Sequence, residues 1–195
     1  MPALRVVLSV VLAAAPALWL PAVAQTTSSN WFGSGHRYLG LNLGRSHYGV
    51  DCGGTAFVCD TSDRSVQVTA GAMASDYWGV ELGYMDLGRI ARAGGKTKAQ
   101  GLNLSLVGKA PVVQQFSVFG KVGTTYGRTE TSAAVGSGVA AGTQHGLGLS
   151  YGAGVSWDFT PRLSATLEWE SNDFRFPGTG RDAVRSTSLG LRYRY

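Results

Sequence analysis

The sequence predicts an all-β protein: an eight-stranded antiparallel up-and-down transmembrane β-barrel preceded by a signal peptide. Eight segments alternate apolar with small or polar residues, which gives each extended strand one apolar and one polar face. The expected connections between these segments alternate between long and short along the chain, as in outer-membrane barrels. The last segment, STSLGLRYRY, ends on the aromatic Tyr195. Such a strand would be an aggregation-prone edge in a soluble domain, whereas in a barrel it can close the wall.

The composition and the amino terminus indicate an exported protein. Charged residues make up only 15% of the 195 residues, against ~25% in typical soluble domains. The formal charge of +5 is largely scattered and forms no nucleic-acid-binding tail, so no nucleic-acid partner is expected. After Arg5, an uncharged stretch leads to the A-x-A pattern of residues 22–24, which favours a cleaved signal peptide over an uncleaved anchor. The expected organisation is a signal peptide, a leader and a barrel domain: residues 1–24, 25–36 and 37–195.

The first half of the chain provides four expected strands: residues 38–46, 65–73, 77–88 and 101–109. Apolar residues occupy every second position in each, as the leucines of LGLNLG show in the first strand. Residues 47–64 show no sustained alternation, so they are expected to form a loop. The basic segment 89–98 is expected to form a second loop, and Pro111 marks the turn after the fourth strand.

The second half provides four more expected strands: residues 116–127, 146–157, 163–170 and 186–195. The fifth is the least regular, because Phe119 lies on the polar face with Lys121. Residues 128–144 are expected to be the longest loop, and a loop with Pro177 leads to the last strand. The apolar face of that last strand matches the apolar face of the first, so these two strands are expected to pair and close the barrel.

Two other all-β architectures fit less well. The strands of a β-sandwich would bury their apolar face and would show no systematic alternation of loop lengths. A lipocalin-type barrel points its apolar face inward, which would leave many Gly and Asn positions on its outer surface without an explanation.

Seven motifs follow one another between Tyr38 and Tyr195: YLGLNLGRS, GVELGYMDLG, LSLVGKAPV, FSVFGKVG, the TPRL turn, LEWE and LGLRYRY. In this order and spacing they resemble the OmpA-like group of small outer-membrane β-barrels. The resemblance implies a barrel in the outer membrane of a Gram-negative bacterium, without the peptidoglycan-binding domain that some relatives carry. It also implies that Tyr195 belongs to an assembly signal, and that Glu81, Lys109 and Glu168 line a lumen and bear on gating of a narrow passage.

Strand alternation directs seven charged side chains into the lumen: Glu81, Lys109, Lys121, Glu168, Glu170, Arg192 and Arg194. Buried charges need partners, because desolvation costs several kcal/mol per ion. The interior of an eight-stranded barrel is only wide enough for its own side chains. We therefore expect a salt-bridge network of Glu81, Lys121, Glu168 and Arg192, with Arg192 as the counter-ion of Glu168 and Lys109 near the periplasmic edge. Such a network can be structural packing or the gate of a narrow channel.

The cysteines and histidines do not indicate a catalytic or metal site. Cys52 and Cys59 are the only cysteines, and in an oxidising compartment a disulfide is favoured over a metal site. His36, His47 and His145 lie at or outside strand ends, without a convincing Ser and acid partner nearby. No enzyme activity, metal or cofactor is therefore expected.

The expected function is structural and interactive: envelope integrity and contacts through the surface loops, with a narrow channel for small solutes or ions as the alternative. The loop that contains the cysteines and the basic loop are candidates for partner contact, because loops on a rigid scaffold often carry recognition. The basic candidates are Arg89, Arg92, Lys96 and Lys98. Expected partners are outer-membrane lipids, lipopolysaccharide, the barrel assembly machinery and surface ligands.

Overall fold

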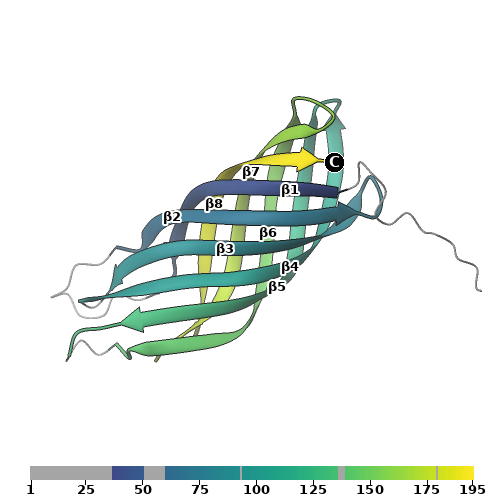
Figure 1. Cartoon of the computed structure of the whole chain (residues 1–195). Helices are drawn as coiled ribbons and strands as arrows, with labels where there is room; N and C mark the ends of the chain where they lie inside the picture. The colour runs from purple at the N-terminus through teal and green to yellow at the C-terminus, as the bar shows by residue number, and fades with distance from the viewer. Residues whose placement is uncertain (1–36, 51–59, 93, 136–138, 179) are drawn as a thin grey trace, which may run out of the picture.

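The computed structural model describes residues 37–50, 60–92, 94–135, 139–178 and 180–195. It contains eight strands: β1 (Arg37–Tyr48), β2 (Ser62–Met73), β3 (Trp78–Arg92), β4 (Gly95–Val113), β5 (Phe116–Ser132), β6 (Gly142–Asp158), β7 (Leu163–Phe176) and β8 (Gly180–Arg194). They form one closed antiparallel barrel in chain order (Figure 1). The predicted fold class is confirmed. Among the described residues, no helix is long and apolar enough to cross a membrane. The predicted signal peptide and leader lie outside the described residues.

Strands β1 and β8 close the barrel, as predicted. Leu41 lies opposite Leu191 and Leu39 opposite Tyr193 in their register. Closure gives both strands a hydrogen-bonded neighbour on each side, which removes the exposed edge that an amphipathic terminal strand would otherwise present.

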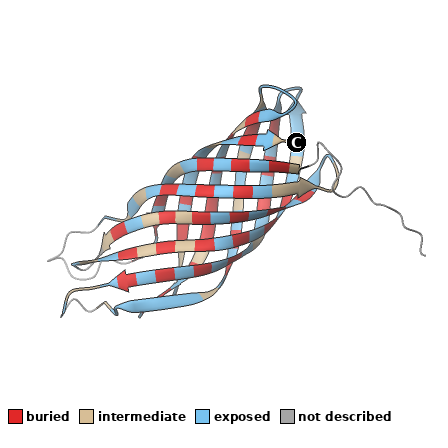
Figure 2. Ribbon diagram, in the orientation of Figure 1, coloured by how far each residue is buried: buried red, intermediate tan, exposed pale blue. Residues whose placement is uncertain are grey.

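Exposed and buried residues alternate along the strands, as the colours of Figure 2 show, because successive side chains of a strand point to opposite faces. The outward residues are mostly apolar and well exposed, for example Leu104 at 55% and Leu189 at 66%. The inward residues at intervening positions are mostly small or polar and buried, such as Thr125 and Ser164. An exposed apolar belt of this extent fits contact with hydrocarbon rather than with water.

Aromatic side chains mark both edges of the apolar belt. We call the end that carries Arg37, Tyr195 and the short turns the turn end, and the opposite end the loop end. Exposed aromatic residues near the turn end are Tyr77, Trp78, Phe116, Trp157, Phe159, Tyr193 and Tyr195. Those nearer the loop end are Tyr84, Tyr126, Tyr151 and Trp169. Two aromatic girdles of this kind are typical of barrels that span an outer membrane.

Several expected connections are strands in the structure. Segment 89–98 is not a loop, because β3 runs to Arg92 and β4 begins at Gly95. Strands β5 and β6 extend into the expected loop 128–144, and β7 and β8 extend toward each other in the same way. Pro111 lies within β4, next to a register shift. The expected alternation of long and short connections therefore holds only in part. Outside a membrane the outward face no longer needs apolar residues, so the period-two signal fades although the backbone pairing continues.

A bulge in β3 changes which residues face inward near the loop end. The register shifts between Asp86 and Arg89, and Gly88 has a φ of 78°, a left-handed conformation that favours glycine. The N–H of Gly88 donates to Oδ1 of Asp86 at 3.0 Å. Because a bulge inserts one extra residue, the phase of the strand changes. Arg89 is exposed and Ile90 is buried as a result.

Candidate functional site

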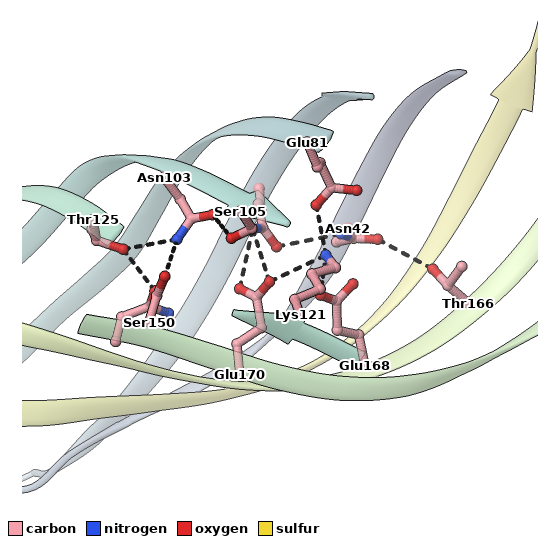
Figure 3. A network of polar contacts seen from close by, with 12 residues as sticks. Asn42, Glu81, Asn103, Ser105, Lys121, Thr125, Ser150, Thr166, Glu168 and Glu170 are labelled. Carbon is pink, nitrogen blue, oxygen red and sulfur yellow. Dashed lines mark hydrogen bonds and ion pairs between the residues drawn. The ribbon is translucent and has the colours of Figure 1, made fainter. Parts of the chain in front are cut away.

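The lumen contains a buried charge cluster centred on Lys121. The Nζ atom of Lys121 on β5 lies 2.6 Å from Oε1 of Glu81 on β3 and 3.2 Å from Oε1 of Glu170 on β7. It also forms an ion pair with Glu168 on β7 (Figure 3). All four residues are buried, because strand alternation points them into the barrel. One ammonium group is therefore shared by three carboxylates.

Arg192 adds a second cation to this cluster. Its Nη2 atom lies 3.5 Å from Oε2 of Glu81, and its guanidinium lies 4.3 Å from the ring centroid of Tyr38. The O–H of Tyr38 donates to the same Glu81 oxygen at 2.7 Å. The expected pairing of Arg192 with Glu168 is wrong. Arg192 lies opposite Ser164, four residues along β7 from Glu168, and this separates the two backbones by ~13 Å along the wall. Strands of a closed barrel are staggered, so charges at similar distances from their strand ends need not lie at the same level of the lumen.

Neutral side chains continue the cluster across the lumen. Gln67 Nε2 donates to Oε2 of Glu170 at 3.1 Å, and Asn42 Nδ2 donates to Oε1 of Gln67 at 3.3 Å. Asn103 Nδ2 donates to the hydroxyls of Thr125 and Ser150 at 2.9 and 2.7 Å (Figure 3). The charge prediction did not include these residues, although strand alternation alone places them inside. Hydrogen-bonded side chains thus fill this part of the lumen.

Two of the predicted lumen charges, Lys109 and Arg194, lie apart from Lys121 at the turn end. Arg194 Nη2 is 2.7 Å from Oδ1 of Asp158, and Lys109 Nζ is 3.9 Å from Oδ2 of the same carboxylate. The hydroxyl of Ser164 also donates to Asp158 at 2.7 Å. The three charged residues are partly exposed, so they form a mouth of the lumen. Asp158 was missed because it lies one residue past the end of the predicted sixth strand.

The lumen near the loop end is apolar rather than charged. Nine buried residues form a cluster that we call the apolar plug: Tyr48, Val50, Met85, Leu87, Ile90, Ala99, Phe174, Phe176 and Val184. The rings of Tyr48 and Phe176 lie 6.3 Å apart. The hydroxyl of Tyr48 accepts the N–H of Ala99 at 3.2 Å and lies 3.0 Å from the carbonyl oxygen of Gly88. The expectation of a lumen filled by a salt-bridge network is therefore wrong for this half of the barrel.

The three clustered carboxylates offer the donor chemistry of a cation site. One oxygen from each of Glu81, Glu168 and Glu170 lies within 4.8 Å of the others. Lys121 forms an ion pair with all three, so the ammonium group already supplies a positive charge at this position. With Arg192, the cluster holds three carboxylates and two cations.

Three of the four predicted surface residues lie on the outer face of β3 and β4. Arg89, Lys96 and Lys98 line a groove of about 360 Å³ together with Glu130 on β5. Lys98 Nζ forms an ion pair with Asp86 at 2.9 Å. The side chain of Arg92 lies outside the described part of the structure. These basic residues therefore occupy paired strands instead of a loop.

A carboxylate on β2 fixes the backbone beside this groove. The N–H of Arg89 donates to Oδ2 of Asp63 at 2.6 Å. This hydrogen bond lowers the pKa of the Asp63 carboxyl below its ordinary value, because it stabilises the ionised form.

The remaining predicted residues are placed only in part. Cys52 and Cys59 lie outside the described residues, as does His36. The N–H of Tyr195 donates to the carbonyl oxygen of Arg37 at 3.2 Å, and its side chain is exposed. The other two histidines contact neighbours on the outer surface: His47 lies 3.4 Å from Thr61, and His145 stacks on Tyr126.

A closed eight-stranded barrel with an apolar belt between aromatic girdles and a lumen filled by side chains is a small outer-membrane β-barrel. Comparison with known proteins specifies the family. Residues 34–195 match the family model of the OmpA-like transmembrane domain. The chain belongs to this family, and its location is the outer membrane.

Relatives and solved structures agree with this assignment. Outer membrane protein A of Shigella flexneri is 32% identical over 173 residues, which cover 81% of this chain and 48% of the relative. Outer membrane protein A of Klebsiella pneumoniae is 31% identical over 175 residues, which cover 81% of this chain and 50% of the relative. The chain thus spans about half the length of these curated relatives.

Solved structures share the fold at lower identity. The crystal structure of Neisserial surface protein A (NspA) has a TM-score of 0.64 at 15% identity, covering 83% of this chain and 98% of its own. The crystal structure of Ail, the attachment invasion locus protein of Yersinia pestis, has a TM-score of 0.52 at 18% identity, covering 81% and 98%.

Proposed function

We propose that the protein is a closed outer-membrane barrel that contributes to envelope integrity and makes surface contacts through its loop end, without enzymatic activity. The observation that carries this proposal is the apolar plug above the Lys121 cluster. A solute that crossed the lumen would have to displace buried apolar side chains such as Phe174 and Ile90, and also the ion pairs of Lys121. Breaking buried pairs and exposing apolar side chains both cost free energy.

The loop end supports the surface role. The β3–β4 and β5–β6 hairpins reach toward this end as paired strands (Figure 1), and recognition is often carried by connecting segments that a scaffold positions. Short turns on outer-membrane barrels usually face the periplasm, so the hairpins would face outward. Ail, a neighbour in fold, has been solved in complex with the heparin analogue sucrose octasulfate. The basic groove of Arg89, Lys96 and Lys98 makes an anionic surface ligand a candidate here.

The turn end supports interaction during assembly. Tyr195 is exposed on the outer surface at the end of the closing strand, where the barrel assembly machinery could recognise it. Outer-membrane lipids are the expected partners of the apolar belt.

A narrow channel is the second candidate function. It is favoured by the polar half of the lumen, where Lys109, Asp158 and Arg194 form a partly exposed mouth below the Lys121 cluster. A passage would require the apolar plug to open.

Planar-bilayer recording of the refolded protein separates the two functions. A closed barrel is expected to give a silent baseline, with insertion verified by the heat-modifiable band of the folded form on gels. Discrete openings of the wild-type protein would contradict the closed barrel and support the channel.

A further inference from the structure

Four basic residues lie side by side on the outer face of four neighbouring strands. Arg45 on β1 lies opposite Arg64 on β2, and Arg89 on β3 lies opposite Lys98 on β4. Strands β2 and β3 are hydrogen-bonded at this position, because the N–H of Arg89 donates to Asp63, the neighbour of Arg64. Adjacent strands are ~4.8 Å apart. We call Arg45, Arg64, Arg89 and Lys98 the basic row.

The basic row begins directly beyond the apolar belt, at Arg45 and Arg64. Arg45 follows the outward Leu43 by two residues, and Arg64 precedes the outward Val66 by two residues. Two strand residues span ~7 Å. The guanidinium groups of Arg45 and Arg64 therefore lie where the hydrocarbon core of a membrane gives way to polar headgroups, and Arg89 and Lys98 lie farther toward the loop end.

Like charges directly opposite each other on neighbouring strands are destabilising. Among the ion pairs of residues 37–50, 60–92 and 94–135, the only one that involves the row joins Lys98 to Asp86. The Asp63 carboxylate accepts the backbone N–H of Arg89 and lies close enough to Arg64 and Arg89 to attract both side-chain charges, so it offsets part of the repulsion within the row. An external anion that contacts two neighbouring cations would offset this repulsion.

We propose that the basic row binds the phosphate groups of anionic glycolipid headgroups in the outer leaflet. Arginine contacts phosphate through two parallel hydrogen bonds, and the strand spacing places neighbouring cations within reach of one phosphate. The groove beside Arg89 and Lys98, with Lys96 on its wall, provides room for the attached sugar. The inference rests on the proposed surface role and gives it a partner. It also assigns Arg45 and Arg64 to the same site as the basic hairpin, although they are distant in sequence.

The test compares two variants that each remove two cations. One is Arg45→Gln/Arg64→Gln in the basic row. The control is Arg175→Gln/Arg181→Gln, a cross-strand arginine pair of β7 and β8 outside the row. Urea unfolding is measured in phosphatidylcholine vesicles, with and without diphosphoryl lipid A. Lipid A should stabilise the wild type and the control. The factor by which lipid A shifts the unfolding equilibrium should be about tenfold smaller for the row variant, which corresponds to the loss of one charge-assisted contact.

A structural role alone would give a different pattern. In pure phosphatidylcholine the row variant should have about the stability of the wild type, because the substitution removes the repulsion between Arg45 and Arg64 together with the attraction of Arg64 to Asp63. Lipid A without its phosphates should not stabilise the wild type. Equal stabilisation of the wild type and the row variant by diphosphoryl lipid A would overturn the proposal, as would stabilisation that persists without the phosphates.

Heparin added to phosphatidylcholine vesicles tests the other anionic ligand. If heparin binds the wild type but not the row variant, while lipid A stabilises both proteins equally, the proposal is also overturned. Conductance is a separate measurement, so failure of the closed-barrel function is distinguishable from failure of this inference.

Discussion

Lys121 and Glu168 contact each other, yet they are not equivalent members of the buried cluster. Lys121 forms ion pairs with three carboxylates, whereas Glu168, among the described residues, forms an ion pair with Lys121 alone. Removing Lys121 would leave three buried carboxylates with Arg192 alone. Removing the charge of Glu168 would leave two carboxylates and two cations.

We therefore expect Lys121→Met to lower the free energy of unfolding by about 3–5 kcal/mol, the usual cost of breaking a buried pair by deleting one partner. Glu168→Gln should cost much less, because Lys121 keeps Glu81 and Glu170. Urea titration in phosphatidylcholine vesicles, followed by tryptophan fluorescence, measures both variants. Equal losses would show that Lys121 is not the centre of the cluster.

Gly71 makes room for the ring of Tyr38 inside the barrel. A Cβ atom at this position would lie 2.1 Å from Cζ of Tyr38, the residue that donates to Glu81. Gly71→Ala should therefore displace the ring and cost about 1–3 kcal/mol, as overpacking commonly does. The midpoint of heat modifiability on gels reports the loss.

Gly108→Ala is the matched control, because a Cβ atom there meets nothing within 4 Å. In a Tyr38→Ala background, the cost of Gly71→Ala should largely disappear, as expected for two coupled positions. A cost that is unchanged in this background would assign the effect to the backbone rather than to the ring.

At the scale of the elements, β8 joins barrel closure to assembly. The strand itself ends at Arg194, and Tyr195 adds one backbone hydrogen bond to Arg37 and an exposed aromatic ring. Deletion of Tyr195 should therefore change the stability of the refolded barrel little but lower its level in the outer membrane severalfold. Membrane fractionation and urea unfolding measure the two effects. Tyr195→Phe keeps the aromatic ring and should assemble normally, and a normal level of the truncated protein would argue against an assembly signal.

The strands within the apolar belt were predictable because hydrocarbon requires an apolar residue at every second position. This requirement ends where the strands leave the belt, so the continuation of β3 and β4 through segment 89–98 gave no period-two signal. Ile90 joins the apolar plug only because the bulge at Gly88 changes the phase of β3. The one extra residue of a bulge cannot be recognised in the alternation of apolar and polar residues along the sequence.

The charged lumen was predictable in composition but not in pairing. Alternation alone directs Glu81, Lys121 and Arg192 inward. Which charges meet depends on the stagger between strands, a property of the closed barrel that no single segment encodes. The Arg192 guanidinium thus meets Glu81 across the lumen rather than Glu168 on the neighbouring strand.

At the scale of the whole molecule, the lumen has two barriers of different chemistry in series. Ion pairs and amide hydrogen bonds fill the part around Lys121, and the apolar plug fills the part near the loop end. A permeating ion would have to cross both. The removal of one barrier should therefore leave the other intact.

This arrangement predicts that conductance requires two lesions. Lys121→Ala alone should stay silent in planar bilayers, because Phe174 and Phe176 still fill the plug. Phe174→Ala/Phe176→Ala alone should also stay silent, because the Lys121 cluster remains. The triple variant should give discrete openings, since truncation opens space in both layers. Phe116→Ala combined with Lys121→Ala is the control, because Phe116 lies on the outer face. Openings of Lys121→Ala alone would mean that the plug is no barrier to ions, and a folded but silent triple variant would mean that the lumen is closed elsewhere as well.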